Sequence, residues 1–474
     1  MNVHTPRSSA PLRQCTGTRP RKTAEPFSHN EVPSGGKVKR KIAVAAALAA
    51  TLLGATACGG GSGSDEAATS ATGAVDGKGK TLKVWLMVDA ETAWKGVVED
   101  ATKRFTEATG AQVNVEYQQW ANHLTKLDAT LAGTDVPDVV ELGNTEFSKY
   151  VFNGGFAELN KGDFENSDTW LTGLSGACEL DGKTYCVPYY AGARVLIYRT
   201  DLFKSAGITE APATYADFLS AAEKLQTANA KDKKFSAFYM PGQYWYAAMS
   251  WVKSKGGEIA TKDGDKWVGQ LSSPASQQGL QAWVDVTKKY SKADVTKNEN
   301  EQAGIFAQGS GGMFYGNGWE QGSAEEVRKD PNDPNSPLVP TKVKGKLAAA
   351  PMPEIPSFLG GSNLGVTQKS ENKELAAQWI KAFTDSKSME GLIAANALPN
   401  STALLDKAAA NPTIKNAALA AKSSWFPPNA EKWADVEKAS ILQTMLTDIL
   451  TGKKTVADGA KWADEQINAT LNEA

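Results

Sequence analysis

The sequence predicts an α/β protein with two lobes, built on parallel β-sheet. The class follows from apolar runs as long as buried strands, which are separated by amphipathic segments of helical spacing. In residues 81–142 these segments alternate as strand, helix, strand, helix and strand, which predicts right-handed crossovers within one parallel sheet. The third observation is the length of 474 residues, because one core rarely serves so long a chain.

The first elements are recognised by the periodicity of their apolar residues. The predicted strands are residues 81–88, 111–120 and 136–142, and the helices between them are residues 92–109 and 122–132. Trp94 lies on the apolar face of the first helix. Gly110 directly after that helix is a plausible stop signal.

A second set of strands and helices follows from the same signals. Strands are expected at residues 183–190, 193–200, 235–240, 311–317, 345–353 and 360–366. Helices are expected at residues 215–229, 244–255, 276–290, 373–385, 435–451 and 456–472, the first of them capped by Thr214. The polar, Pro-rich segment 331–340 is expected to be a loop.

Residues 37–64 predict export and attachment to a lipid. A basic cluster at residues 37–41 precedes an apolar run at 42–53, which is too short to span a bilayer as a permanent helix. The small residues before Cys58 resemble the lipobox of bacterial lipoproteins, although Ala55 stands where Leu is commonest. The resemblance implies cleavage before Cys58 and a diacylglycerol on its thiol, which holds the protein on the outer face of the membrane. An ordinary cleaved signal peptide is the alternative.

The two amino-terminal segments lie outside the predicted fold. Residues 1–57 are interpreted as leader and signal peptide, and the Gly-, Ser- and Ala-rich residues 58–79 as a flexible tether. The leader holds nine of the 51 Lys and Arg residues and two of the 53 Asp and Glu residues, which leaves 42 basic and 51 acidic residues in the exported chain. This acidic balance argues against a nucleic-acid partner.

Cysteine and histidine are scarce in the exported chain. Cys178 and Cys186 are eight residues apart, and an Asp-Gly turn between them favours a hairpin that a disulfide would close. Two reduced thiols are the alternative. His123 is the only histidine after residue 57, so zinc sites with several histidines are excluded. A catalytic serine or cysteine that is activated by histidine would have to use His123. We expect a structural or surface role for His123 instead.

Six segments occur in the order typical of one protein family. They are residues 83–88, 136–159, 181–208, 306–319, 360–385 and 426–433. Over nearly its whole length, from Leu82 to Leu471, the chain resembles the extracellular solute-binding proteins of sugar ABC importers, the family that contains maltose-binding protein.

The resemblance implies a periplasmic-binding-protein-like fold, in which two α/β lobes close on a ligand about an interlobe hinge. Lobe one would comprise residues 80–187 plus 364–422, and lobe two residues 192–357 plus 427–474. The hinges would lie near Tyr189, Gly361 and Phe426.

Aromatic side chains are the first candidates for a sugar site, because they stack on the apolar faces of sugar rings. Trp319 follows a strand where the family places a stacking tryptophan, and Tyr244 and Trp245 hold the matching place after an earlier strand. Trp425 or Trp433 stands where the family has a further aromatic residue. A place in the core is the alternative for each of them.

Polar candidates lie at strand ends and in the expected crossovers. Asn144 and Thr145 follow a strand at its carboxyl end, where ligands bind in open α/β sheets. The remaining candidates are Gln243 and Asn317 beside the aromatic residues, Asn363 and Tyr189 in the hinge segments, Arg194 after a crossover, and Asp89 and Trp120 at the ends of the first two strands. An ion pair between strands is the alternative for Arg194.

These observations favour capture of a mono- or oligosaccharide without chemistry, by a monomer that needs no cofactor or metal. The resemblance implies delivery to an ABC permease driven by a cytoplasmic ATPase. Two alternatives remain open: the same fold could bind a non-sugar solute, or two of the acidic residues could serve a secreted glycoside hydrolase.

Overall fold

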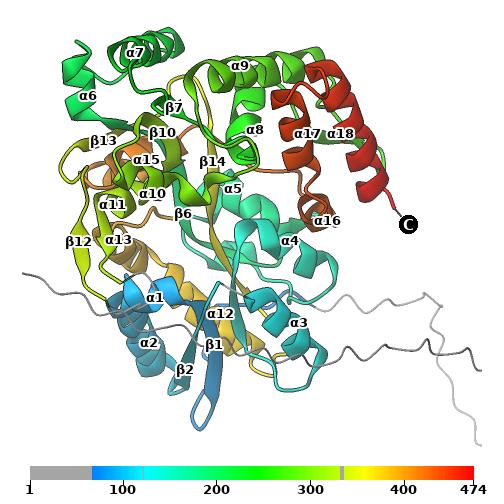
Figure 1. The fold of residues 1–474 in the computed structure, drawn as a ribbon. Helices are drawn as coiled ribbons and strands as arrows, with labels where there is room; N and C mark the ends of the chain where they lie inside the picture. Colours follow the sequence, from blue (N-terminus) through cyan, green and yellow to red (C-terminus); the bar gives the residue numbers. More distant parts are fainter. Residues whose placement is uncertain (1–66, 121, 331–335, 474) are drawn as a thin grey trace, which may run out of the picture. The chain divides into compact units, whose positions relative to one another are not determined.

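The computed structural model describes residues 67–120, 122–330 and 336–473 (Figure 1). The predicted signal peptide, Cys58 and residues 58–66 of the predicted tether lie outside these residues. The rest of the predicted tether is described, and it is not all free of the fold: Ala71 is buried in the first-lobe core, and its backbone nitrogen donates to Asp163. No helix in the described ranges is both long and apolar enough to cross a membrane.

The amino-terminal part forms the parallel sheet that the sequence predicts. Strand β1 (Thr81–Met87) pairs in parallel with β2 (Gln112–Gln118) on one side and with β3 (Val139–Gly143) on the other. Helices α2 (Lys95–Thr109) and α3 (His123–Ala132) form the crossovers, and Gly110 ends α2 in the left-handed conformation. The predicted helix 92–109 begins later, at Lys95. Thr92 instead ends a separate short helix, α1 (Val88–Thr92).

Two long strands carry the sheet from one lobe into the other. β6 (Val187–Arg199) and β14 (Ser357–Val366) pair antiparallel with each other, β14 also pairs with β3, and β6 also pairs with β10 (Gly311–Asn317). The strand order is β2-β1-β3-β14-β6-β10-β7. The predicted parallel pairing holds among β1, β2 and β3, but the sheet as a whole is mixed, because a chain that crosses between lobes and returns leaves neighbouring strands in opposite directions.

The second lobe surrounds the far ends of these strands. β7 (Ser236–Tyr239) pairs in parallel with β10, and β13 (Leu347–Ala350) pairs antiparallel with β6. The main helices are α7 (Tyr215–Ala228), α8 (Trp245–Ser254), α9 (Pro274–Tyr290), α17 (Ile441–Leu450) and α18 (Val456–Leu471). Thr214 caps α7 as predicted, since its side chain accepts a hydrogen bond from the backbone of Asp217.

The remaining elements are short or join these layers. The helices are α4 (Asn144–Phe152), α5 (Thr172–Ser175), α6 (Thr200–Ser205), α10 (Gln302–Ala307), α11 (Glu320–Glu325), α12 (Lys373–Thr384), α13 (Ser386–Ala394), α14 (Leu405–Ala409), α15 (Lys415–Ala421) and α16 (Trp433–Lys438). The strands are β4 (Glu179–Leu180), β5 (Lys183–Thr184), β8 (Ala260–Asp263), β9 (Lys266–Gly269), β11 (Glu326–Arg328), β12 (Leu338–Pro340) and β15 (Ser424–Trp425).

Three predictions of individual elements are wrong. The predicted strands 183–190 and 193–200 are one continuous strand from Val187 onward, because Ala191 and Gly192 continue the ladder with β14. The predicted helix 435–451 is divided between α16 and α17 by Ser440 in the left-handed region. The segment 331–340 ends in β12 and is not all loop.

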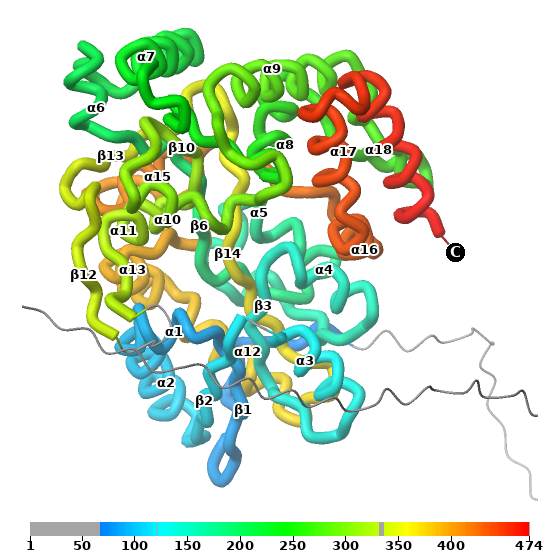
Figure 2. Tube along the Cα trace, in the orientation of Figure 1, coloured from blue at the N-terminus to red at the C-terminus, as the bar shows by residue number. Residues whose placement is uncertain are grey.

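The chain returns to its amino-terminal elements after β14. Figure 2 shows this yellow segment beside the blue one, where α12 packs against α2. Trp379 and Phe383 of α12 are fully buried in one core with Leu82 and Val84 of β1. Helix α15 instead packs against β6, and α14 packs against α15, in a core that also includes Phe314 of β10. That core also includes Leu174 of α5 and Ile393 of α13, so it joins residues from both predicted lobes.

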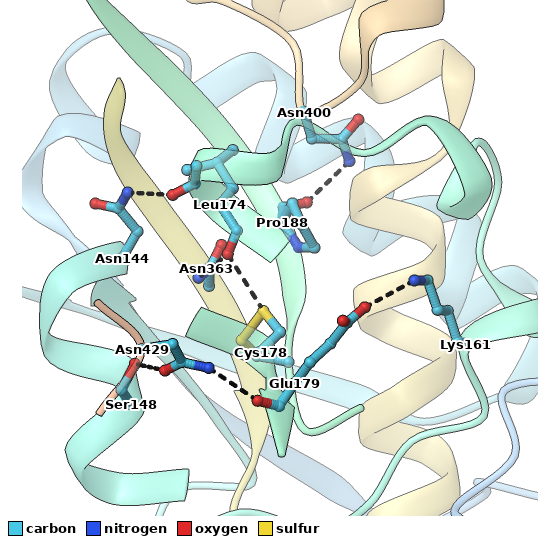
Figure 3. The surroundings of a disulfide bond; sticks show 12 residues. Asn144, Ser148, Lys161, Leu174, Cys178, Glu179, Pro188, Asn363, Asn400 and Asn429 are labelled. Atoms are coloured by element: carbon cyan, nitrogen blue, oxygen red, sulfur yellow. Dashed lines mark hydrogen bonds and ion pairs between the residues drawn. A yellow bond between two sulfur atoms is a disulfide. The ribbon is translucent and has the colours of Figure 1, made fainter. Parts of the chain in front are cut away.

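A small hairpin holds the two described cysteines. β4 and β5 pair antiparallel across Asp181 and Gly182, and a disulfide joins Cys178 to Cys186 with Cα atoms 4.8 Å apart (Figure 3). Figure 3 also shows Asn429 between Ser148 and the hairpin: its amide accepts from the Ser148 hydroxyl and donates to the carbonyl of Glu179.

Candidate ligand-binding cleft

A cavity of about 1090 Å³ lies between the two lobes. Its lining begins at the carboxyl ends of β1, β3 and β10, where open α/β sheets bind their ligands. Further lining comes from β6 and β14 and from residues 395–398, 412–414 and 416–417. Elements from both lobes and both crossover strands therefore converge on one hollow.

The crossover strands form a closely packed floor beneath the cavity. Gly192 of β6 lies directly under the ring of Trp319, because a Cβ atom on it would be 2.4 Å from the ring carbon Cζ3. Gly361 of β14 has φ of +142°, and a Cβ atom there would be 2.1 Å from the carbonyl oxygen of Tyr190. Glycine is required at both positions for this close approach.

The wall from the first lobe combines aromatic rings with a carboxylate. Trp120 is 38% exposed, and its Nε1 donates to Asp89 at 2.6 Å. Trp94 packs against Tyr190, with ring centroids 5.1 Å apart, and its indole nitrogen donates to the hydroxyl of Tyr189. Trp94, Trp120 and Tyr190 therefore offer apolar surface of the kind that stacks on sugar rings.

The start of α4 brings a second polar group to this wall. Asn144, Thr145 and Glu146 follow β3 directly and line the cavity. Glu146 accepts a hydrogen bond from the backbone of Gly143 and contacts Nε2 of His123 at 2.9 Å. Nδ1 of His123 lies 2.7 Å from the carbonyl oxygen of Trp120.

The contacts of His123 define its protonation. Both ring nitrogens face oxygen acceptors, so the imidazolium form satisfies both contacts. Burial alone would lower the pKa of His123, but the hydrogen bond and charge of Glu146 raise it above the usual value. Beneath this group, burial raises the pKa of Glu141 to about 7, and its Oε2 accepts from the backbone of Met87.

The wall from the second lobe carries the most exposed tryptophan. Trp319 is 59% exposed and precedes α11, and Asn317 ends β10 beside it. Backbone and side-chain nitrogens of Asn317 both donate to Glu320, at 2.7 and 3.2 Å. These bonds fix the Asn317 amide against the wall.

Arg194 lies in the floor between two aromatic rings. Its guanidinium carbon is 4.7 Å from the ring centre of Tyr246 and 4.6 Å from that of Phe358. Its Nε donates to the hydroxyl of Tyr244 at 2.7 Å, and Nη2 lies 3.9 Å from Glu299. The cation is thus held by groups of the protein.

A model of the bacterial extracellular solute-binding proteins matches residues 100–422. The chain belongs to this family. The diacetylchitobiose-binding protein DasA of Streptomyces coelicolor is 33% identical over 444 residues, which cover 92% of this chain and 99% of that protein. The family and this relative are solute-binding proteins rather than enzymes.

Solved structures share the two-lobed fold of this solute-binding protein. The GacH receptor of Streptomyces glaucescens, solved unliganded and with acarbose, has a TM-score of 0.66 at 19% identity, covering 83% of this chain and 99% of the receptor. A solute-binding protein of Thermotoga lettingae bound with α-D-tagatose has a TM-score of 0.64 at 22% identity, covering 83% and 100%. Both likenesses concern the fold alone.

Half of the residues predicted to bind ligand line the cavity of this solute-binding protein. They are Asp89, Trp120, Asn144, Thr145, Arg194, Asn317 and Trp319. All but Arg194 lie at or just beyond the carboxyl end of a strand, or at the start of the helix that follows the strand. Ligands bind at this place in open α/β sheets, so strand ends were the feature of the sequence that predicted these residues. Their place on the lining is established, and their roles in binding stay predictions.

The structure places the other predicted residues away from the cavity lining. Trp245, Tyr244, Trp433 and Trp425 are 0–6% exposed and pack in the second-lobe core, and Trp425 borders a separate hollow of about 720 Å³. Tyr189 and Asn363 are fully buried, the latter donating to the carbonyl of Leu174. Gln243 donates to Thr447.

Several lining residues were not predicted. They include Trp94, Tyr190, Tyr246, Phe358, Glu146, Gln321, Glu325, Asn396 and Asn416. The start of α8 explains why Tyr246 lines the cavity in place of the predicted Trp245. Successive helix residues point about 100° apart, so Trp245 enters the core while Tyr246 reaches the cavity. Among the residues that the structure describes, no group of three His, Cys, Asp or Glu side chains could hold a metal ion.

Proposed function

We propose that this protein captures a mono- or oligosaccharide outside the cell and delivers it to an ABC permease. The observation that carries the proposal is the interlobe cavity, whose walls combine exposed aromatic rings with amides and carboxylates. Aromatic rings suit the apolar faces of sugars, and the polar groups suit their hydroxyls.

Relatives support a chito-disaccharide as the first ligand to test. The relative from Streptomyces coelicolor binds diacetylchitobiose according to its name, and it covers nearly the whole chain at 33% identity. Ligand would favour the closed state of the two lobes, because only a ligand that binds that state better can shift the equilibrium. The hinge would consist of β6 and β14 near Tyr189 and Gly361, with the third connection near Phe426.

A thermal-shift screen tests the sugar proposal. The panel contains N,N′-diacetylchitobiose, cellobiose, maltose and monosaccharides, with amino acids, peptides and polyamines as controls. A ligand at 100 times its Kd adds about 2.7 kcal/mol, so the melting temperature should rise with one class of sugar. A rise with a non-sugar solute alone would keep the fold and reject the sugar.

The attachment and the covalent state of the exported chain are further parts of this proposal. The lipobox-like segment supports a diacylglycerol on Cys58, and the protein would act as a tethered monomer beside its permease. The pairing of Cys178 with Cys186 would persist in the oxidising exterior. Mass spectrometry of membrane-extracted protein without reductant tests both: an unmodified Cys58 or two free thiols would reject the respective part.

A further inference from the structure

The polar groups of the cavity differ in whether they can donate or accept hydrogen bonds. Asn144 is 3% exposed and lines the cavity, and its Nδ2 donates to the carbonyl oxygens of Gly173 at 2.7 Å and of Leu359 at 2.9 Å. Two carbonyl partners require the amide nitrogen at this place. Figure 3 shows the Asn144 nitrogen turned to its partner and the oxygen turned away from it. Because both N–H groups are used, the oxygen is the group that Asn144 can offer a ligand.

Two further asparagines on the lining have the same orientation. Nδ2 of Asn317 donates to the Glu320 carboxylate at 3.2 Å, and Nδ2 of Asn416 donates to the carbonyl oxygen of Ala349 at 2.8 Å. Their amide oxygens remain as acceptors. Asn396 has the reverse arrangement, because its Oδ1 accepts from Asn411 at 3.1 Å. Asn144, with both N–H groups bonded, therefore offers only an acceptor, whereas Asn317 and Asn416 each offer an acceptor and one further N–H.

Carboxylates add further acceptors, and negative charge, to the lining. Asp89, Glu146 and Glu325 line the cavity, and the one cation among its described lining residues is Arg194. Oδ2 of Asp89 accepts from Trp120, and Oε2 of Glu146 accepts from Gly143 and contacts His123, so each has a second oxygen left over. Glu325 forms no ion pair with a described residue.

Arg194 does not offset these carboxylates for a ligand. Its two faces are covered by Tyr246 and Phe358, its Nε is bound to Tyr244, and its Nη1 is enclosed without a partner. Glu299 at 3.9 Å already faces its charge. An anionic group that entered the cavity would therefore meet Asp89 and Glu325, which form no ion pair with a described residue, and Glu146, whose charge already faces His123.

We propose that this cavity refuses sugars carrying a carboxylate or a phosphate and takes neutral or amino sugars instead. Neutral hydroxyls and amines supply the donors that the amide oxygens and carboxylates need. A desolvated anion facing like charges loses binding free energy, which is how a site rejects a wrong partner. The inference rests on the proposed function, since it narrows the class of sugar.

Calorimetric titration of the purified protein with matched sugars tests the inference. The neutral set is diacetylchitobiose, cellobiose, galactobiose and glucose; the anionic set is cellobiouronic acid, digalacturonic acid and glucose 6-phosphate. We expect at least one neutral sugar to bind, and each anionic sugar to bind at least about tenfold more weakly than its neutral counterpart. An anionic sugar that binds as tightly as its counterpart, or anionic sugars binding alone, would overturn the inference but keep the proposed function.

Charge-neutralising variants separate electrostatic selection from shape. Glu325→Gln and Asp89→Asn should narrow the ratio between neutral and anionic sugars severalfold, because each removes one repelling charge while keeping the size of the side chain. Glu107→Gln is the control, since Glu107 is an exposed residue of α2 outside the cavity lining. An unchanged ratio in both cavity variants would contradict the inference, and no binding by any sugar would reject the inference and the proposed function together.

Discussion

Trp319 combines a large exposed surface with a fixed position above Gly192, which is the arrangement of a stacking platform. Replacement of Trp319 by alanine should weaken sugar binding by about 1–3 kcal/mol, because the stacked ring contributes on that scale. The melting temperature without sugar should change little, since the side chain is mostly outside the core. Calorimetric titration measures the loss.

A matched control for Trp319 is available on the same lobe. Leu338 is 58% exposed and does not line the cavity, so Leu338→Ala should leave binding unchanged. Equal affinity of Trp319→Ala and the parent protein would remove Trp319 from the site.

The contribution of His123 to the stability of the fold should depend on pH. Its pKa is raised in the folded protein, so its contribution to stability is fully present below its unfolded pKa of about 6.5 and is lost as pH rises through the folded value. His123→Asn should therefore cost more stability at pH 5.5 than at pH 9. Urea unfolding of both proteins at the two pH values gives the difference; a cost that grows with pH would show that the imidazolium is not the stabilising form.

At the scale of elements, the floor of the cleft depends on a glycine that no side chain could replace. Gly361 of β14 has a positive φ and lies against the backbone of β6. Gly361→Ala should lower the free energy of unfolding by more than about 1 kcal/mol, because both the conformation and the space exclude a Cβ atom. Thermal unfolding measures this loss.

Gly96 provides the comparison for Gly361. It lies within α2, and a methyl group added to it would have open space for 4 Å around. Gly96→Ala should raise stability by less than about 1 kcal/mol, because alanine is favoured over glycine in helices but Gly96 is only the second residue of α2. Similar effects of the two substitutions would contradict the packing described for β14.

Individual elements show which parts of the fold could be predicted from the sequence and which could not. The buried runs of β1 and β3 and the helix between β1 and β2 were predictable, because burial and periodicity are local signals. The continuity of β6 was not, because Ala191 and Gly192 suggest a break unless the neighbouring β14 is known. Trp94 was expected on a helix core face, but it lies just before α2, outside the helical periodicity, and lines the cavity.

At the scale of the whole molecule, neither lobe is built from one continuous segment. The core around β1 includes Leu364 and Val366 of β14 and Trp379 of α12. A fragment of residues 65–186 should therefore fail to fold, because the core would lack these residues of β14 and α12. Strand β3 would keep β1 as a neighbour but lose β14 on its other side. Circular dichroism should show no cooperative melt for the fragment; a sharp transition would contradict this account.

The candidate site could be predicted only in part, because segments far apart in the sequence also combine to form it. Strand ends pointed to Asp89, Asn144 and Asn317, since the rule for open sheets needs no knowledge of packing. Residues such as Asn416 and Phe358 come to the cavity from segments far away along the chain, and their approach is a property of the assembled sheet.

The exposed tryptophans give the protein an optical reporter of its own. Of its 13 tryptophans, Trp120 and Trp319 are the ones with large exposed surfaces, and both lie on cavity walls. A bound sugar would shield these two indoles from water, together with the half-buried Trp94 on the same wall as Trp120, while leaving the core tryptophans unaffected. Intrinsic fluorescence should therefore shift to shorter wavelength on binding, which allows an unlabelled titration of each ligand.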